Sequence, residues 1–276
     1  RPIDDGWGVT GLFNNQNYAG AWLCIIFPLC LGFLLKKNQN KLINYSNFLI
    51  VISFVIMIIL TTSRSAVLAT LFSYFLLSKF NRSKIFLILF SIIGIFGVYE
   101  IFNFLNIDIE TISNQFLPSG IYNKISTFNL SNISSFPRVD IWSKTLILIS
   151  SNLFFGYGAG SFSKIYTSFN GTFEGIQHSH NIFLELAFNH GIIISILILF
   201  PMINLLICSY KKFLISKRDG ISSLIDKAWI ISFTSFLLIH MFDITYFDGR
   251  ISLLCWILLA GLRSMINTEI SDQSSL

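Results

Sequence analysis

Two kinds of sequence meet at residues 178–210, HSHNIFLELAFNHGIIISILILFPMINLLICSY. Imidazoles, an amide and the carboxylate of Glu185 come first, and a predominantly apolar run follows from residue 192 to residue 210. About twenty apolar residues of helix cross the hydrocarbon core of a bilayer. Polar groups at the start of such a segment are costly unless they have a function. The stretch therefore predicts a membrane helix with a reactive site at its N-terminal end, beside His180.

The composition of the whole chain is typical of a membrane protein. Of its 276 residues, 53% are hydrophobic and only 12% are charged, whereas about 25% of the residues of a soluble domain are charged. All four cysteines lie inside apolar runs, which argues against a disulfide framework or a zinc cluster. The net charge of +5 comes without a basic face interleaved with aromatic residues, so nucleic-acid binding is not expected.

Seven apolar segments predict an all-α fold, a polytopic transmembrane helical bundle. They cover residues 18–35, 48–60, 66–77, 85–105, 184–210, 228–246 and 251–262. We expect one membrane domain over residues 1–276, within which residues 106–180 form a large loop region. Because the chain begins at Arg1 without a leader, we also expect it to be the C-terminal part of a longer chain.

Basic residues predict the orientation of these segments. They cluster at Lys36, Lys37 and Lys41, at Lys79, Arg82 and Lys84, at Lys211, Lys212, Lys217 and Arg218, and at Arg263. All of these positions fall on one side of the predicted bundle, which the positive-inside rule makes cytoplasmic. The residues around Asn14, the loop region and residues 246–250 then share the outer face. Arg64 lies there too, in a tight turn between the second and third segments.

The loop region contains a predicted amphipathic helix. From residue 138 to residue 153, Trp142, Leu146, Ile149 and Leu153 recur at helical spacing and define an apolar face. Pro137 suits the first turn of this helix, and the glycines of residues 156–160 end it in a flexible turn. A helix of this kind lies at the membrane interface and carries Arg138 over the membrane surface. The Gly-x-Gly-x-Gly run lacks a preceding strand and a P-loop lysine, so it does not predict nucleotide binding.

Four short motifs occur together along the chain. They are Ser63-Arg64, Arg138 followed by Ile141-Trp142, the run GYGAGSF at residues 156–162, and His180-Asn181 ahead of Gly191. Over residues 11–207 the set resembles the O-antigen ligase and O-antigen polymerase superfamily. The resemblance implies a helical protein of the bacterial inner membrane that transfers a glycan from undecaprenyl diphosphate to an acceptor hydroxyl. The acceptor would be the lipid A core for a ligase and a second lipid-linked glycan for a polymerase.

The residue types suit this chemistry. Displacing a lipid diphosphate from an anomeric carbon needs cations for the leaving group and a base for the acceptor proton. Arginine binds phosphate oxygens bidentately, so Arg64 and Arg138 are predicted to hold the diphosphate. Histidine titrates near working pH, and His180 is the predicted base of an inverting reaction. A helix that begins at Asn181 would also offer backbone donors to an anion.

Other residues have supporting or structural interpretations. We expect His178 to lie beside His180, and Glu185 to orient an imidazole. The two histidines could also be an interfacial pair or a metal pair, but no third metal ligand is evident nearby, so no metal or cofactor is expected. His240 and Asp243 lie three apart in a predicted span, where a buried structural hydrogen bond is favoured over a proton relay.

Alternatives remain open at this point. Arg64 and Arg138 could be plain interfacial anchors at helix ends. The function could be glycan transfer, by ligase or polymerase, or the transport of a small anion. A transporter should show helices broken at the midplane and paired halves, and the sequence has no internal repeat. The expected partners are the lipid bilayer and lipid-linked glycans.

Overall fold

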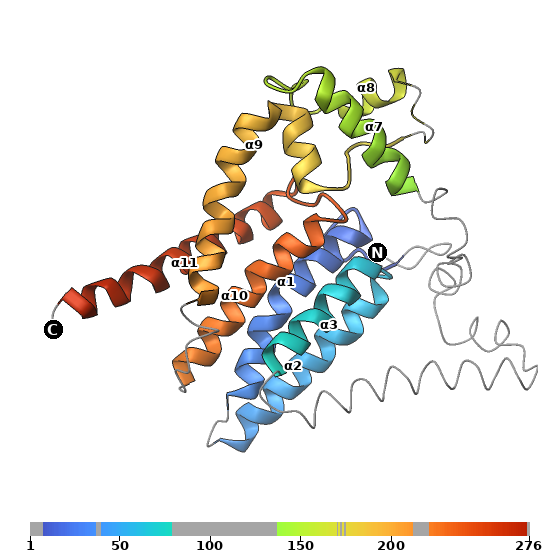
Figure 1. Cartoon of the computed structure of the whole chain (residues 1–276). Coiled ribbons are helices and arrows are strands. Elements are labelled where there is room, and N and C mark those ends of the chain that lie inside the picture. The colour runs from blue at the N-terminus through green and yellow to red at the C-terminus, as the bar shows by residue number, and fades with distance from the viewer. Residues whose placement is uncertain are drawn as a thin grey trace, which may run out of the picture. The chain divides into compact units, whose positions relative to one another are not determined.

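The computed structural model describes residues 8–36, 40–78, 137–169, 171, 173, 175–211 and 221–274. Within these ranges the elements are α-helices (Figure 1). They belong to two compact units, which are described separately. The first unit holds α1 (Gln16–Leu35), α2 (Lys41–Leu60) and α3 (Arg64–Ser78). The second holds α7 (Pro137–Ser151), α8 (Phe162–Ser168), α9 (Ile182–Ser209), α10 (Ile221–His240) and α11 (Gly249–Ser274). The predicted all-α class is confirmed, while the predicted segment at residues 85–105 lies outside the described residues.

Several of the described helices can span a membrane. Four are long and apolar enough: α1, α2, α9 and the part of α11 from Gly249 to Asn267. α3 is apolar over Arg64–Leu77 but shorter, and α10 is not among the four. The chain is therefore a multi-pass membrane protein. The number of seven spans, the periplasmic side of the loop region and the interfacial position of α7 stay predictions.

The first unit is held together by close packing at the start of α1. A Cβ on Gly20 would lie 2.9 Å from the Cβ of Ala66, so α1 and α3 are in near backbone contact. The buried side chain of Gln16 accepts a hydrogen bond from Thr62 Oγ1 at 2.8 Å. This bond ties α1 to the turn at residues 61–63, between α2 and α3. The predicted tight hairpin is present, with Arg64 as the first residue of α3.

In the second unit, α9 is bent at Gly191. The dihedral angles of this residue, φ 77° and ψ 167°, belong to a region that is essentially restricted to glycine. A Cβ there would overlap the carbonyl oxygen of Phe154. The bend separates residues 182–190 from residues 192–209, and Figure 1 shows the yellow first part turning sharply from the orange remainder. The predicted segment at residues 184–210 is therefore two helical pieces.

α10 ends earlier than the sequence predicts. It stops at His240, and residues 241–248 form turns instead of continuing to residue 246. The ring of His240 donates from Nδ1 to the carbonyl of Phe236 at 2.7 Å, and Nε2 accepts from Thr245 Oγ1 at 3.1 Å. These bonds agree with the structural interpretation of His240. Asp243 lies beyond the helix, so the prediction that it shares a helix face with His240 is wrong.

α7 is the predicted amphipathic helix, and Pro137 is its first residue. Its buried residues are Ile141, Thr145, Leu148 and Ile149. The three apolar ones pack in a core with Phe188 of α9 and with Phe162 and Tyr166 of α8. Of the predicted apolar face, Ile149 is buried in this core, whereas Leu146 is 56% exposed and Leu153 is exposed as well. Packing against α8 and α9 therefore buries one part of the apolar face and leaves the other part exposed. The short helix α8 was not predicted from the sequence.

Candidate active site

The two histidines lie in the short segment before α9. His180 has a φ of 56°, a left-handed conformation that is uncommon outside glycine. The next residue, Asn181, caps the helix, because its Oδ1 accepts from the backbone N–H groups of Phe183 at 3.0 Å and Leu184 at 3.2 Å. Its Nδ2 donates to the carbonyl of Met241 at 3.2 Å, which joins the segment to the turn after α10. Two backbone donors that we expected to be open to an anion are therefore occupied.

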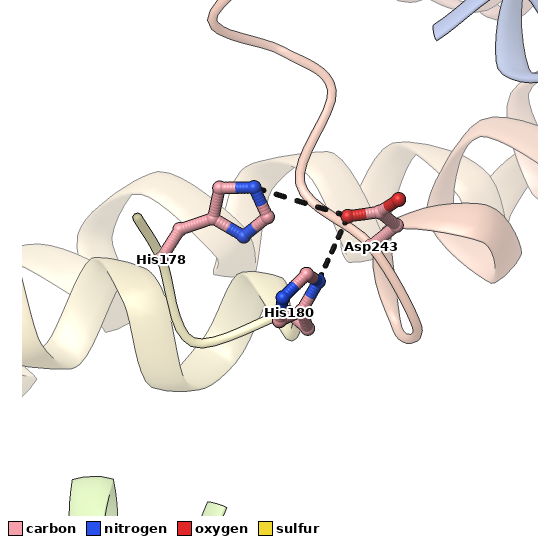
Figure 2. A group of neighbouring side chains, drawn as sticks. All are labelled: His178, His180 and Asp243. Atoms are coloured by element: carbon pink, nitrogen blue, oxygen red, sulfur yellow. Dashed lines mark hydrogen bonds and ion pairs between the residues drawn. The ribbon is translucent and has the colours of Figure 1, made fainter. Parts of the chain in front are cut away.

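Asp243 is the group that both imidazoles face (Figure 2). Its Oδ1 lies 3.0 Å from His180 Nδ1 and 3.9 Å from His178 Nε2. The same oxygen accepts the backbone N–H of Ile244 at 2.9 Å, and the residue is only 3% exposed. Sequence reasoning missed this partner because 63 residues separate Asp243 from His180 and no local pattern connects them. The one available signal was a carboxylate near the predicted outer end of a span.

Electrostatics separates the roles of these side chains. Burial raises the pKa of Asp243, but the hydrogen bond from His180 and the charges of the two histidines outweigh it, and the net pKa is lowered. Burial lowers the pKa of His178 to about 4; the charges of His180 and Arg138 act in the same direction and that of Asp243 opposes them. At neutral pH, Asp243 is therefore a carboxylate and His178 a neutral ring.

The contact with Asp243 determines which nitrogen of His180 carries the proton. A carboxylate only accepts hydrogen bonds, so Nδ1 of His180 is the donor. In the neutral ring this leaves Nε2 without a proton. The side chain is 23% exposed, so the ring is partly accessible. An imidazole oriented by a buried carboxylate, with its other nitrogen able to accept, is the arrangement that a general base requires.

The side chain of Glu185 holds the backbone of the histidine segment in place. The side chain is 1% exposed, and its Oε2 accepts from the backbone N–H of Ser179 at 2.8 Å. Its Oε1 accepts from Asn189 Nδ2 at 2.9 Å. We expected Glu185 to orient an imidazole, and in the structure Asp243 does this instead. Glu185 lies in the first turn of α9, where it reaches back to the peptide between the two histidines.

The glycine-rich turn after α7 is fixed to the bend in α9. Three backbone hydrogen bonds join them: Tyr157 N to Phe188 O at 2.8 Å, Gly158 N to Asn189 O at 2.9 Å, and Ile192 N to Leu153 O at 2.8 Å. They satisfy groups of α9 near the break at Gly191. A Cβ on Gly156 would lie 2.6 Å from Gly191 N, so the two glycines allow the close approach. The turn that we expected to be flexible is hydrogen-bonded, and the glycine and histidine motifs form one structural unit.

The two predicted phosphate-binding arginines belong to different units. Arg138 is the second residue of α7, and its charge contributes to the lowered pKa of His178. It therefore acts on the histidine cluster electrostatically. Arg64 is the first residue of α3 in the first unit. Its convergence with Arg138 stays a prediction.

The cluster has the spacing of a metal site. The ligand atoms of His178, His180 and Asp243 all lie within 4.8 Å of one another, so one divalent ion could contact all three. The expectation that no third ligand lies near the histidines is wrong, because Asp243 supplies one. In the structure, Oδ1 of Asp243 accepts hydrogen bonds from the His180 ring and from the backbone N–H of Ile244. A metal-independent reaction stays a prediction.

The fold and the site define a multi-pass membrane protein with a histidine–carboxylate pair at its helix ends. A model of the O-antigen ligase family matches residues 48–199. The match covers more than half of the chain, and the protein belongs to this family of ligase- and polymerase-type membrane proteins. The matched range includes Arg64, Arg138, the glycine turn and His180, and it ends before Asp243. No curated protein matches the chain.

Gly191→Ala is expected to disrupt the bend in α9. The added methyl group overlaps the carbonyl of Phe154, and the backbone conformation is strained for any L side chain. Such overpacking costs about 1–3 kcal/mol, so the melting temperature in detergent should fall by several degrees. Gly158→Ala is the control, because Gly158 also has a positive φ but its Cβ would meet no atom within 4 Å. Equal melting temperatures for the two variants would contradict the close-approach argument.

His178 is expected to make the protein less stable in mild acid. Burial lowers its pKa from the ordinary 6.5 to about 4 in the folded protein, so over this range the unfolded chain binds a proton that the folded chain does not. The free energy of unfolding should therefore fall as the pH falls from 6.5 towards 4. His178→Asn removes this contribution to the pH dependence of stability. The melting temperature of the variant should therefore fall less than that of the wild type between pH 6.5 and pH 4. Parallel melting profiles of the two proteins against pH would show that His178 is not buried as a neutral ring.

Proposed function

We propose that the protein is a membrane glycosyltransferase that moves a glycan from undecaprenyl diphosphate to an acceptor hydroxyl. We assign it as an O-antigen ligase that uses the lipid A core as acceptor in the biosynthesis of lipopolysaccharide or surface polysaccharide. Family membership supports the class of reaction. The observation that carries the proposal is the 3.0 Å contact between His180 Nδ1 and Asp243 Oδ1, because it supplies the base that the acceptor hydroxyl needs.

His180 acts as the general base. The acceptor oxygen attacks the anomeric carbon of the glycan, and its proton passes to Nε2 of His180. The imidazolium that forms is stabilised by the carboxylate of Asp243, whose lowered pKa keeps it charged. A positioned base of this kind contributes about 10²–10⁴-fold to the rate. His178 and Asn181 are supporting residues, as is Glu185, which holds the peptide between the histidines.

Arginine stabilises the leaving group. As the acceptor oxygen attacks, the bond between the anomeric carbon and the phosphate oxygen breaks, and undecaprenyl diphosphate leaves with the electron pair. Arg138, whose charge already acts on the histidine cluster, binds the diphosphate together with Arg64. Attack from the face opposite the leaving group inverts the anomeric centre. The reaction uses no metal and no cofactor, and the site faces the periplasm at the bacterial inner membrane.

Two alternatives use the same residues differently. A polymerase joins lipid-linked repeat units with the same donor, base and cations, and differs only in the acceptor. A transporter of a small anion would use backbone groups freed at a broken helix. α9 is broken, but the groups at its break bond to the glycine turn, and the His180–Asp243 pair lies at helix ends. These contacts favour transfer over transport.

Transfer is expected to depend on His180, Arg138 and Asp243. In a strain that lacks the protein, the wild type should restore glycan on the lipid A core, while His180→Ala and Arg138→Ala should restore none. Asp243→Asn should lower the rate of the purified protein about 10²-fold or more, because the ring loses its charged partner. Attached glycan is read on gels, and membrane insertion is checked by blotting. His190→Ala and Arg263→Ala are the matched controls and should restore attachment.

The same strain separates the acceptor classes. Loss of a ligase leaves no repeat on the core, whereas loss of a polymerase leaves a single repeat. We expect none. A single repeat would replace the ligase assignment with the polymerase, and full-length glycan in both the His180→Ala and Arg138→Ala strains would overturn the transferase.

Glycan transfer is expected to persist without divalent ions. EDTA should leave the rate of the purified protein in liposomes unchanged, because arginine neutralises the diphosphate and Asp243 serves the imidazole. The rate of product formation is measured before and after chelation. Readdition of Zn²⁺ or Mg²⁺ should bring no gain, and a rate lost with EDTA and recovered with either ion would assign the cluster to a metal instead.

A further inference from the structure

An exposed aromatic pair, Phe154 and Phe155, lies between α7 and the glycine-rich turn at residues 156–160. Phe155 is 85% exposed and Phe154 is 60% exposed. Phenylalanine rings are stabilised by leaving water for an apolar medium, so two adjacent exposed rings are unfavourable in water. No charged residue occurs between Lys144 and Lys164 to solvate this part of the chain. The surroundings of the pair therefore favour an apolar medium.

The aromatic pair continues the apolar outer side of two helices. On α7 the exposed residues include Leu146 and Ile147, and on α9, just past the bend, Ile193, Ile194 and Leu197 are between 44% and 64% exposed. The hydrogen bond from Ile192 N to Leu153 O joins the turn to the first residue of that part of α9. Residues 192–209 belong to a helix that can span the membrane, so their exposed apolar side faces lipid. The pair thus lies where this lipid-facing surface begins.

The pair is also held in place. The carbonyl of Phe154 lies against Gly191, where no Cβ fits, and the following Gly156 contacts the same bend. The pair is therefore positioned by the backbone of α9 and is not at the tip of a free loop. A rigid apolar projection at the end of a spanning segment is suited to insertion at the boundary of a bilayer.

We propose that Phe154 and Phe155 insert into the bilayer at this boundary and anchor the turn to the lipid. The first part of α9, residues 182–190, is about 13 Å of helix at 1.5 Å per residue, and it leads from the anchored bend back to Asn181. The anchor would hold the cluster around His180 close to the membrane surface. This inference rests on the membrane spans and the contacts of the bend, and it is independent of the proposed reaction.

The depth of Phe155 can be measured directly. In a background without the four native cysteines, Phe155→Cys and Phe154→Cys are labelled with an environment-sensitive dye and placed in phosphatidylcholine–phosphatidylglycerol liposomes. Nitroxide-bearing lipids should quench both labels, and iodide in the buffer should not. Leu197→Cys is the lipid-facing control, and Arg250→Cys, at a side chain that is 47% exposed, is the aqueous control.

The outcomes decide the proposal. Quenching by nitroxide lipids to the level of the Leu197→Cys label supports insertion. Quenching by iodide to the level of the Arg250→Cys label would place the pair in water and overturn it. Protection from both quenchers would show that protein covers the pair, such as a second copy of the chain, and would overturn it equally.

Discussion

A helix that breaks inside a membrane protein must find new partners for the backbone groups that the break frees. In α9 the break is at Gly191, and the turn that follows α7 supplies the partners. Glycine is required on both sides of this contact, because a Cβ at Gly156 or at Gly191 would overlap the opposing backbone. The bend directs residues 182–190 away from the rest of the helix. Those residues carry the groups that shape the histidine segment.

The histidine segment is then fixed from two directions. From α9, Glu185 accepts the N–H of Ser179, and Asn181 caps the helix. From the turn after α10, the carbonyl of Met241 accepts from Asn181, and Asp243 accepts from His180. The chemical groups are therefore placed at the ends of helices that meet, where a lipid-linked donor and a polar acceptor can both arrive in the proposed reaction. In the proposed reaction, a base in the middle of a membrane span would be out of reach of the diphosphate group and of the polar acceptor.

Much of this architecture was predictable because hydropathy and local signals determine it. The long apolar runs identified α1, α2, α9 and α11, Pro137 marked the start of α7, and the break between two apolar runs located the hairpin at Arg64. The end of α10 was predicted wrongly for a physical reason. Ile244 and Tyr246 continue the apolar pattern after His240, but they pack in the core between α9 and the turn, outside any helix.

The features that could not be predicted from the sequence depend on tertiary contacts. The pairing of Asp243 with His180 joins two segments that share no motif, and Asp243 lies outside the residues that the family model matches. The positive φ of Gly191 gives no signal of its own, since a glycine within an apolar run is equally compatible with a straight helix. The part of the apolar face of α7 that becomes buried is likewise determined by packing against α8 and α9.

The central claim is that the His180–Asp243 pair is the base of a reaction on a lipid diphosphate. A structure of the protein with a non-reactive analogue of its lipid-diphosphate-linked glycan bound in a lipid nanodisc tests it most directly. The account predicts that the diphosphate contacts Arg138, that Nε2 of His180 faces the anomeric carbon from the side opposite the phosphate, and that Nδ1 still bonds to Asp243. A diphosphate bound away from the histidine segment, or an Nε2 turned into the protein, would contradict it.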